Sequence, residues 1–237
     1  MSENIIVEGG PPQNTTFGVP GTEAVVDATF GAGRMSLRPN EFINQGVGGG
    51  HYKAAATFTT ATQLAGAAPV FAMRWAPPNG AAPLFLLKRI QMGWILTTAL
   101  TAAQAIDFAV YRCTGFTAAD TGGTPLTPFT GNNNKVRSGL MATSVVNDMR
   151  IGALAAGTRT VDANPFGYLP FMQQAAANTI FSTGIPLTDV YAENLLNEHP
   201  EMFAANEGFE VQVLTGFPAA GAVKLYVVVE WAEVPGL

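Results

Sequence analysis

A glycine-rich segment and a single pair of histidines are the first features of this sequence that could do chemistry. Residues 46–50 contain four glycines and suggest a phosphate-binding loop. A P-loop, however, lies between a strand and a helix and ends in Lys followed by Ser or Thr. Here His51 follows the last glycine instead. We therefore interpret residues 46–50 as a hinge before the first strand, and residues 130–135 as an exposed loop.

The histidines also give little support for a metal site. His199 and Glu201 match the His-x-Glu half of a zinc deaminase motif. The other half of that motif is a pair of cysteines, and this chain has one cysteine, Cys113. His51 and His199 could still meet at a metal ion, but a polar loop before a strand is the better interpretation of His199. We predict no metal and no cofactor.

A nucleophile is equally hard to find. Cys113 lies close to Tyr111 in an apolar run, which is typical of a small buried side chain. The chain lacks the Gly-x-Ser-x-Gly elbow of serine hydrolases and the Asp-x-Asp-x-Asp-Gly pattern of calcium loops. Asp107 lies within an apolar run and Asp162 in a turn-like segment. Glycoside hydrolysis needs two carboxylates that face one cleft, and the sequence leaves every pairing of carboxylates open. We predict that the protein is not an enzyme.

The three tryptophans, Trp75, Trp94 and Trp231, all fall in strand-like runs. Core packing is the first interpretation for all of them, and the alternative is a platform on which sugar rings stack. Trp231 lies at the end of its run, so it is the best candidate of the three for contact with a partner.

Alternation of apolar and polar side chains predicts most of the secondary structure. The expected strands are residues 52–59, 70–75, 84–97, 106–113, 209–214 and 223–231, with weaker candidates at 148–153 and 158–162. The last two strong runs are predicted to form a β-hairpin around a loop at 216–221. Gly93 suggests a bulge or bend inside its strand.

The remaining segments are predicted as loops and short helices. Residues 120–125 and 130–134 have loop composition, and short helices are possible at 99–105, 171–177 and 189–196. About eight short strands with little helix predict an all-β fold, a jelly-roll-like β-sandwich with an extended N-terminal arm. We assign residues 1–50 to the arm and residues 51–237 to the sandwich body.

The arm is rich in glycine and proline but also carries apolar side chains. Residues 24–26 and 34–39 are its only candidates for ordered structure, and Phe30 and Phe42 are apolar groups that it must bury. We expect the arm to dock on a neighbouring molecule or on its own body. A mobile tail with a few adhesive residues is the alternative.

Composition indicates what kind of surface this chain has. Only 12% of the residues are charged and 48% are hydrophobic, whereas about a quarter of an average globular protein is charged. The net charge of -5 and the absence of a basic run argue against nucleic acid as a partner. Charged residues interrupt the longest apolar region, 81–110, so it is not a membrane span. Such a surface loses its water at low cost and suits a component of an assembly.

Six segments carry a further signal in combination: residues 34–39, 71–77, 116–124, 130–135, 162–165 and 206–234. Together these segments resemble a family of tailed-bacteriophage virion proteins of about this length. The resemblance spans most of the chain. It implies a virion structural protein, and by analogy with phage shell accessory proteins a capsid decoration (cement) protein on the capsid surface, made in the cytoplasm of the bacterial host.

That resemblance gives the expected partners. They are the major capsid protein and further copies of the chain itself, with a trimer favoured over a dimer. Arg34 and Arg38 would pair with carboxylates or carbonyls of the partner, and Phe30 and Phe42 would anchor the arm. Alternatives are a neck, tail or fibre-base component, a module that binds host glycans through Trp231 or through Phe116 and Phe129, and, last, a cell-wall hydrolase.

Overall fold

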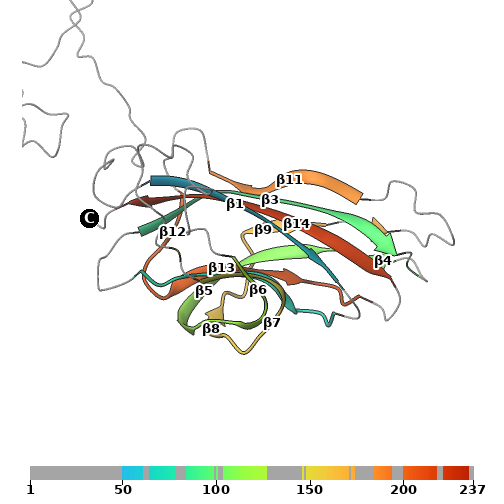
Figure 1. The fold of residues 1–237 in the computed structure, drawn as a ribbon, viewed down its shortest axis with the longest axis horizontal. Coiled ribbons are helices and arrows are strands. Elements are labelled where there is room, and N and C mark those ends of the chain that lie inside the picture. Colours follow the sequence, from blue (N-terminus) through green and yellow to red (C-terminus); the bar gives the residue numbers. More distant parts are fainter. Residues whose placement is uncertain are drawn as a thin grey trace, which may run out of the picture.

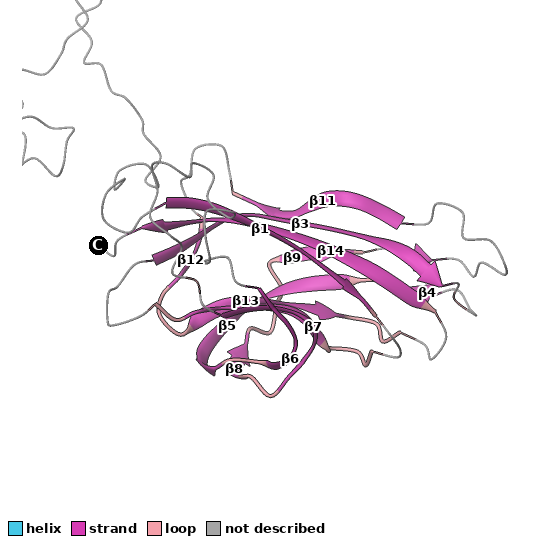
Figure 2. Ribbon diagram, viewed as in Figure 1, coloured by secondary structure: helices cyan, strands magenta, loops and turns pink. Residues whose placement is uncertain are grey.

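The computed structural model describes residues 50–60, 64–77, 84–98, 100, 104–126, 146, 148–170, 172–173, 184–193, 200–217 and 221–234. These residues form two antiparallel sheets packed face to face, and they contain no helix (Figures 1 and 2). The predicted all-β sandwich is therefore confirmed. The described part of the chain has no helix with the length and apolar character needed to cross a membrane. The described residues begin at Gly50, the first residue of β1, so residues 1–49 of the predicted arm lie outside them.

The first sheet has the pairing order β1-β14-β3-β11, and β12 also pairs with β3. Its strands are β1 (Gly50–Thr59), β3 (Leu84–Thr98), β11 (Gly184–Ala192), β12 (Glu201–Phe203) and β14 (Ala222–Val234).

The second sheet has the pairing order β6-β7-β2-β13-β5-β8, and β9 also pairs with β5. Its strands are β2 (Pro69–Trp75), β5 (Phe108–Ala118), β6 (Thr121–Leu126), β7 (Asp148–Ala155), β8 (Thr158–Val161), β9 (Gly167–Leu169) and β13 (Glu207–Val213). A separate short pair joins β4 (Gln104–Ala105) to β10 (Met172–Gln173).

The core lies between the two sheets and follows the alternation seen in the sequence. In β3, Ile90, Met92 and Trp94 are fully buried on the inner face, as predicted. β2 presents Phe71 and Met73 to the same core from the other sheet. Because side chains of a strand alternate between faces, one face of each sheet is left for contacts outside the core.

The predicted hairpin of residues 209–214 and 223–231 is wrong. β13 lies in the second sheet between β2 and β5, whereas β14 lies in the first sheet between β1 and β3. Both strands turn an apolar face inward, and these two faces meet across the core instead of pairing side by side. The segment 214–221 is long enough to cross the roughly 10 Å between stacked sheets.

Strand pairing also replaces several predicted loops and helices. Residues 121–126 form β6, although their composition predicted a loop. Gly122 and Gly123 have positive φ angles, and a side chain at either would collide with the backbone of β7. The glycines thus allow close, irregular pairing. The helices predicted at 99–105, 171–177 and 189–196 are wrong where described, because residues 104–105, 172–173 and 189–192 are strand.

Candidate interaction surface

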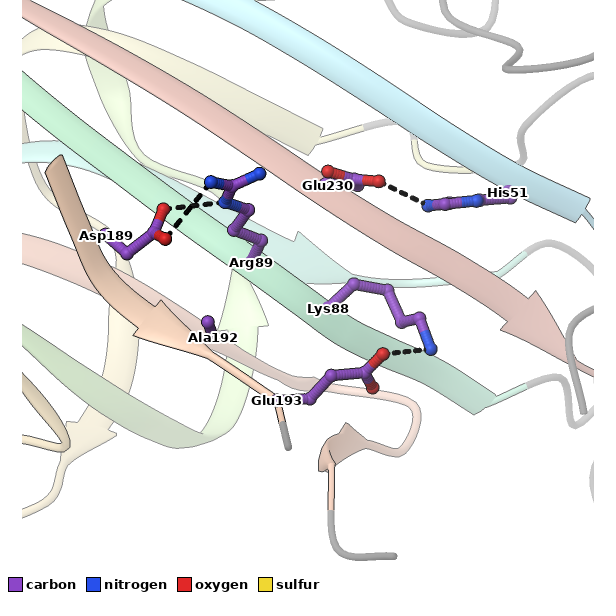
Figure 3. Close-up of a pocket in the computed structure, with 7 residues that line it drawn as sticks. All are labelled: His51, Lys88, Arg89, Asp189, Ala192, Glu193 and Glu230. Atoms are coloured by element: carbon purple, nitrogen blue, oxygen red, sulfur yellow. Dashed lines mark hydrogen bonds and ion pairs between the residues drawn. The ribbon is translucent and has the colours of Figure 1, made fainter. Parts of the chain in front are cut away.

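The described part of the first sheet has a charged depression at one end of its outer face (Figure 3). Its volume is about 380 Å³, and it is bordered by β1, β14, β3 and β11. The lining residues are His51, Lys88, Arg89, Asp189, Ala192, Glu193 and Glu230. Four strands far apart in sequence, and Glu193 just after β11, therefore bring acidic and basic groups to one place.

The charged groups of the depression pair with one another. Arg89 donates from Nε to Asp189 Oδ1 at 2.6 Å and from Nη2 to Asp189 Oδ2 at 3.1 Å. His51 Nε2 lies 2.8 Å from Glu230 Oε1, and Lys88 forms an ion pair with Glu193. Figure 3 shows all three pairs side by side on the sheet. The lining groups are close to neutral in total when His51 is protonated.

Two bulges place these side chains. In the pairing of β14 with β3, Glu230 lies opposite Arg89 and Trp231 opposite Leu87, so Lys88 is the extra residue. In β11 a second shift between Asp189 and Tyr191 leaves one extra residue. A bulge redirects the side chains around it. This allows the neighbouring cations Lys88 and Arg89 both to reach the depression.

The two hydrogen bonds between Arg89 and Asp189 favour the charged forms of both side chains. The hydrogen bond from Arg89 holds the pKa of the Asp189 carboxyl below its ordinary value. The same bond raises the pKa of the Arg89 guanidinium. Both side chains are about 40% exposed, at 40% and 42%, so water and salt screen this pair strongly.

The depression has groups for binding but no evident nucleophile among its lining residues. Within the ranges that the structure describes, no cluster of three or more His, Cys, Asp or Glu side chains could hold a metal ion. The arrangement can bind a polar partner by exchanging its exposed Arg89–Asp189 pair for external contacts.

An uncharged area lies next to the depression on the same outer face. The pairing register places Thr57, Tyr226 and Gly93 in one row across β1, β14 and β3. The neighbouring row contains Ala55 and Val228. The side chains of these two rows on β1, β14 and β3 are neutral. Lys224 from the next row lies over the Tyr226 ring, with Nζ 5.4 Å from the centroid, and Ile95 opposite Lys224 is 43% exposed.

The second sheet has a different charged cluster, which is buried on its outer face. Glu210 alternates along β13 with Phe209 and Val211, which face the main core, so Glu210 faces the other way. There Arg159 donates from Nη1 to Asp120 Oδ2 at 2.7 Å and also forms an ion pair with Glu210. We call Arg159, Asp120 and Glu210 the buried ion cluster.

Apolar side chains enclose this cluster. The Arg159 guanidinium lies over the Phe116 ring, with Cζ 4.6 Å from the ring centroid. Phe116 belongs to a small second core with Ala72, Cys113 and Leu154. Burial, followed by the charge of Glu210, raises the pKa of the Cys113 thiol. The interpretation of Cys113 as a small buried residue is confirmed, and its thiol stays protonated at neutral pH.

The structure places only one of the five predicted contact residues. Phe30, Arg34, Arg38 and Phe42 lie outside the described residues. Trp231 is fully buried in the main core. Its ring stacks on Phe85 with centroids 5.8 Å apart.

The burial of Trp231 corrects its predicted role as a contact for a partner or a sugar ring. Its indole Nε1 donates to Glu233 Oε1 at 3.1 Å inside the protein. Trp75 and Trp94 are buried as well, so the core interpretation of the tryptophans is confirmed. Phe116 is also buried, whereas Phe129 and His199 lie outside the described residues.

Sequence reasoning missed the depression, although one signal was present. Lys88 and Arg89 are adjacent in a strand whose inner face is apolar. In a regular strand one of the two would point into the core, so adjacent cations indicate a bulge. No sequence signal identified Asp189 or Glu193 as their partners, because these pairs join residues about a hundred positions apart.

A scan against protein-family models found no match to this chain, and a search of curated proteins found none either.

Proposed function

We propose that this protein is a non-enzymatic structural component of a tailed-bacteriophage virion. In this proposal it is a capsid decoration (cement) protein that binds the outer surface of the capsid shell and bridges neighbouring capsomers. Its partners are the major capsid protein and other copies of itself, a trimer being favoured, and neither nucleic acid nor membrane is among them. The resemblance of the sequence to phage virion proteins is one support.

The observation that carries the proposal is how the chain uses its few charges. Most described cations are committed to carboxylates of the same chain: Arg74, Lys88, Arg89, Arg112 and Arg159. Next to the depression, the rows of Thr57, Tyr226 and Gly93 and of Ala55 and Val228 carry no charged side chain on β1, β14 or β3. Neutral faces can pack against neighbouring subunits without like-charge repulsion, and many modest contacts repeated by symmetry give strong binding through avidity.

The strand order supports a jelly-roll arrangement within this proposal. With the added β6 and β7 and the short strands set aside, successive strands alternate between the sets β1-β14-β3-β11 and β2-β13-β5-β8. The exception is the step from β5 to β8, which stays within the second sheet. Jelly rolls are common among viral capsid and lectin domains. Fold alone does not decide between such uses.

Cryo-electron microscopy of intact virions tests this proposal directly. Density for the chain over the capsomers, in hundreds of copies, is the expected result. Density only at the neck, tail or fibre base would overturn the capsid-binding role and favour the alternative virion location. Absence of the chain from purified virions would overturn the virion role altogether.

A truncation tests the role of the arm. Removal of residues 1–40 should weaken binding to capsids that lack the native protein, because it removes Phe30, Arg34 and Arg38. Cosedimentation with capsids measures the loss, and circular dichroism checks that the body remains folded. Unchanged binding by a folded truncation would remove the arm from the mechanism.

The glycan-binding alternative loses much of its support. Two of the three aromatic residues that it relied on, Trp231 and Phe116, are buried. A glycan array probed with the intact protein would still reveal binding through another surface.

A further inference from the structure

The strands at the outer edges of the two sheets differ in how well they resist pairing with another chain. In the main pairing orders these outer strands are β1 and β11 in the first sheet and β6 and β8 in the second. An unpaired edge is a template for an additional strand, and proteins protect it with short strands, prolines, bulges or charges.

Three of the four outer strands carry such protection. β11 contains Pro186 and two shifts of register against β3. β6 has only six residues, including Pro125, and its register against β7 shifts at the glycine pair. β8 has four residues and an irregular register against β5.

β1 has none of these features except one lysine. It is ten residues long, contains no proline, and pairs with β14 without a single shift from Gly50 to Thr59. Lys53 is its only Lys, Arg, Asp or Glu. Within the described residues β14 is its one strand neighbour.

The direction of the backbone groups of β1 follows from one hydrogen bond. Thr59 lies opposite Lys224 of the antiparallel strand β14. The N–H of the next residue, Thr60, donates to the carbonyl of Val223 at 2.9 Å. Backbone groups of successive residues in a strand point to opposite sides. The N–H and C=O of Ala55 and Thr57 therefore point away from β14, toward the outer side of β1.

The inner side chains along this edge also leave room for an addition. Ala54 and Ala56 are small, and Ala56 and Phe58 are only partly buried against the main core. An added strand would place its own inward side chains beside these residues and complete their burial.

We propose that the outer edge of β1 binds residues 24–30 of a second copy of this chain as an additional strand. In that segment Val26, Ala28 and Phe30 alternate with Val25, Asp27 and Thr29. The apolar set faces the core beside Ala56 and Phe58, and the other set lies on the outer face with Ala55 and Thr57.

The position of residues 24–30 in the chain favours pairing with β1 of a second copy over pairing with β1 of the same molecule. The 19 residues from 31 to 49 separate it from β1, whereas hairpin loops usually have two to five residues. The segment nearer to β1 contains Pro39 and several polar residues and is poorly suited to a strand. A link of 19 residues spans up to roughly 60 Å, which is enough to reach a neighbouring molecule.

Intermolecular disulfide trapping tests the proposal with the full-length chain. One preparation carries Thr57→Cys, and the other carries a single cysteine at one of positions 25 to 29 in turn. Native Cys113 is buried and does not compete. After mixing and mild oxidation, we expect heterodimers with cysteines at 25, 27 or 29, and at least ten-fold fewer at 26 and 28. Paired residues of neighbouring strands are close enough for a disulfide.

Two further variants keep the result interpretable. Ala55→Pro removes a donor from the outer edge without removing a β1–β14 hydrogen bond, so it should abolish trapping at Thr57→Cys while circular dichroism stays native. Ala153→Cys, exposed on β7 between two paired strands, is the matched control and should give no heterodimer.

Several outcomes would overturn the proposal. One is an equal yield of heterodimers at all five positions from 25 to 29, and another is a yield no higher than that of the Ala153→Cys control. A third is a preference for Thr57→Cys homodimers, which would indicate pairing of two β1 edges. The last is a chain with both cysteines that forms the cross-link only within one molecule. This inference rests on the proposed function, because strand exchange between copies would serve assembly on the virion. The cross-linking experiment itself uses the purified protein and needs no virion. Heterodimers from a chain absent from virions would sink only the proposed function, and a capsid-bound chain without heterodimers would sink only this inference.

Discussion

The two outer faces of the sandwich use the same ion-pair chemistry in opposite surroundings. On the first sheet, the Arg89 and Asp189 side chains are 40% and 42% exposed. On the second sheet, the Arg159 and Asp120 side chains are 8% and 2% exposed. Similar groups at similar distances therefore have different energetic roles, because burial decides how much of their interaction water screens.

The difference separates structural charges from charges available to a partner. Members of the buried ion cluster have lost most of their hydration, so each depends on the others for compensation. The Arg89–Asp189 pair of the depression keeps much of its water and can be exchanged for contacts with another molecule at low cost. Lys88 and Glu193 beside it are only 9% and 14% exposed, so their pair is closer to the structural class. In a chain with so few charges, this contrast suggests which face is part of the fold and which can bind.

Removal of the buried cation should have the largest effect. Arg159→Ala leaves the carboxylates of Asp120 and Glu210 buried without their cation, and should lower the free energy of unfolding by about 3–5 kcal/mol. Urea denaturation followed by tryptophan fluorescence measures it. A loss below about 1 kcal/mol would mean that water reaches the cluster, and would erase the contrast between the two faces.

A matched variant separates loss of the charge from loss of the side chain's volume. Combining Arg159→Met with Asp120→Asn and Glu210→Gln removes all three charges together. We expect this triple variant to be more stable than Arg159→Ala, because no uncompensated charge remains buried.

An alkaline titration should have an intermediate effect and reports on the same second core. Burial raises the pKa of Cys113 in the folded protein, so the unfolded chain loses its thiol proton first. The stability that depends on the Cys113 proton is fully present below the unfolded pKa of about 8.5. It declines as the pH rises from there toward the higher folded pKa, by up to about 1.4 kcal/mol per pH unit.

Cys113→Ala should remove that decline. From pH 8 to pH 10, under reducing conditions, the native protein should lose about 2 kcal/mol more stability than the variant. Tyr52, whose pKa is also raised by burial, adds a decline in both proteins above its ordinary pKa of about 10. Parallel curves for the two proteins between pH 8 and pH 10 would show that the thiol is accessible to water.

Alternation of side chains made the strands and their inner faces predictable, but not their neighbours. The inner residues of β3 could be named because an apolar face has the same period in any sheet. The hairpin prediction failed because β13 and β14 both have such a face, and the pattern does not say whether two faces meet across the core or share a sheet. Tertiary contacts decide that, and they join residues far apart in sequence.

Glycine and bulges explain most of the other differences. Loop composition around Gly122 concealed β6, since glycine favours turns and also permits close pairing of twisted strands. The extra residue in β11 brings Val190 and Tyr191, both partly buried, side by side and breaks the alternation that would have identified a strand. The charged depression depends on the bulge at Lys88, and the buried ion cluster depends on folding that joins three distant strands or turns.

The smallest expected effect belongs to the exposed pair of the depression. Arg89→Ala should lower the free energy of unfolding by less than about 1 kcal/mol, because the pair is hydrated and screened. Since the pKa of Asp189 is lowered in the folded protein, its contribution is present above the unfolded pKa and is lost as the pH falls through the folded value.

A double-mutant cycle with Arg89→Ala and Asp189→Asn isolates the pair from other contacts. We expect a coupling of about 0.2–1 kcal/mol that shrinks as salt is added. A coupling above about 2 kcal/mol that resists salt would mean that the pair is desolvated. The depression would then belong to the structural class of the buried ion cluster, and its charges would not be free to exchange with those of a partner.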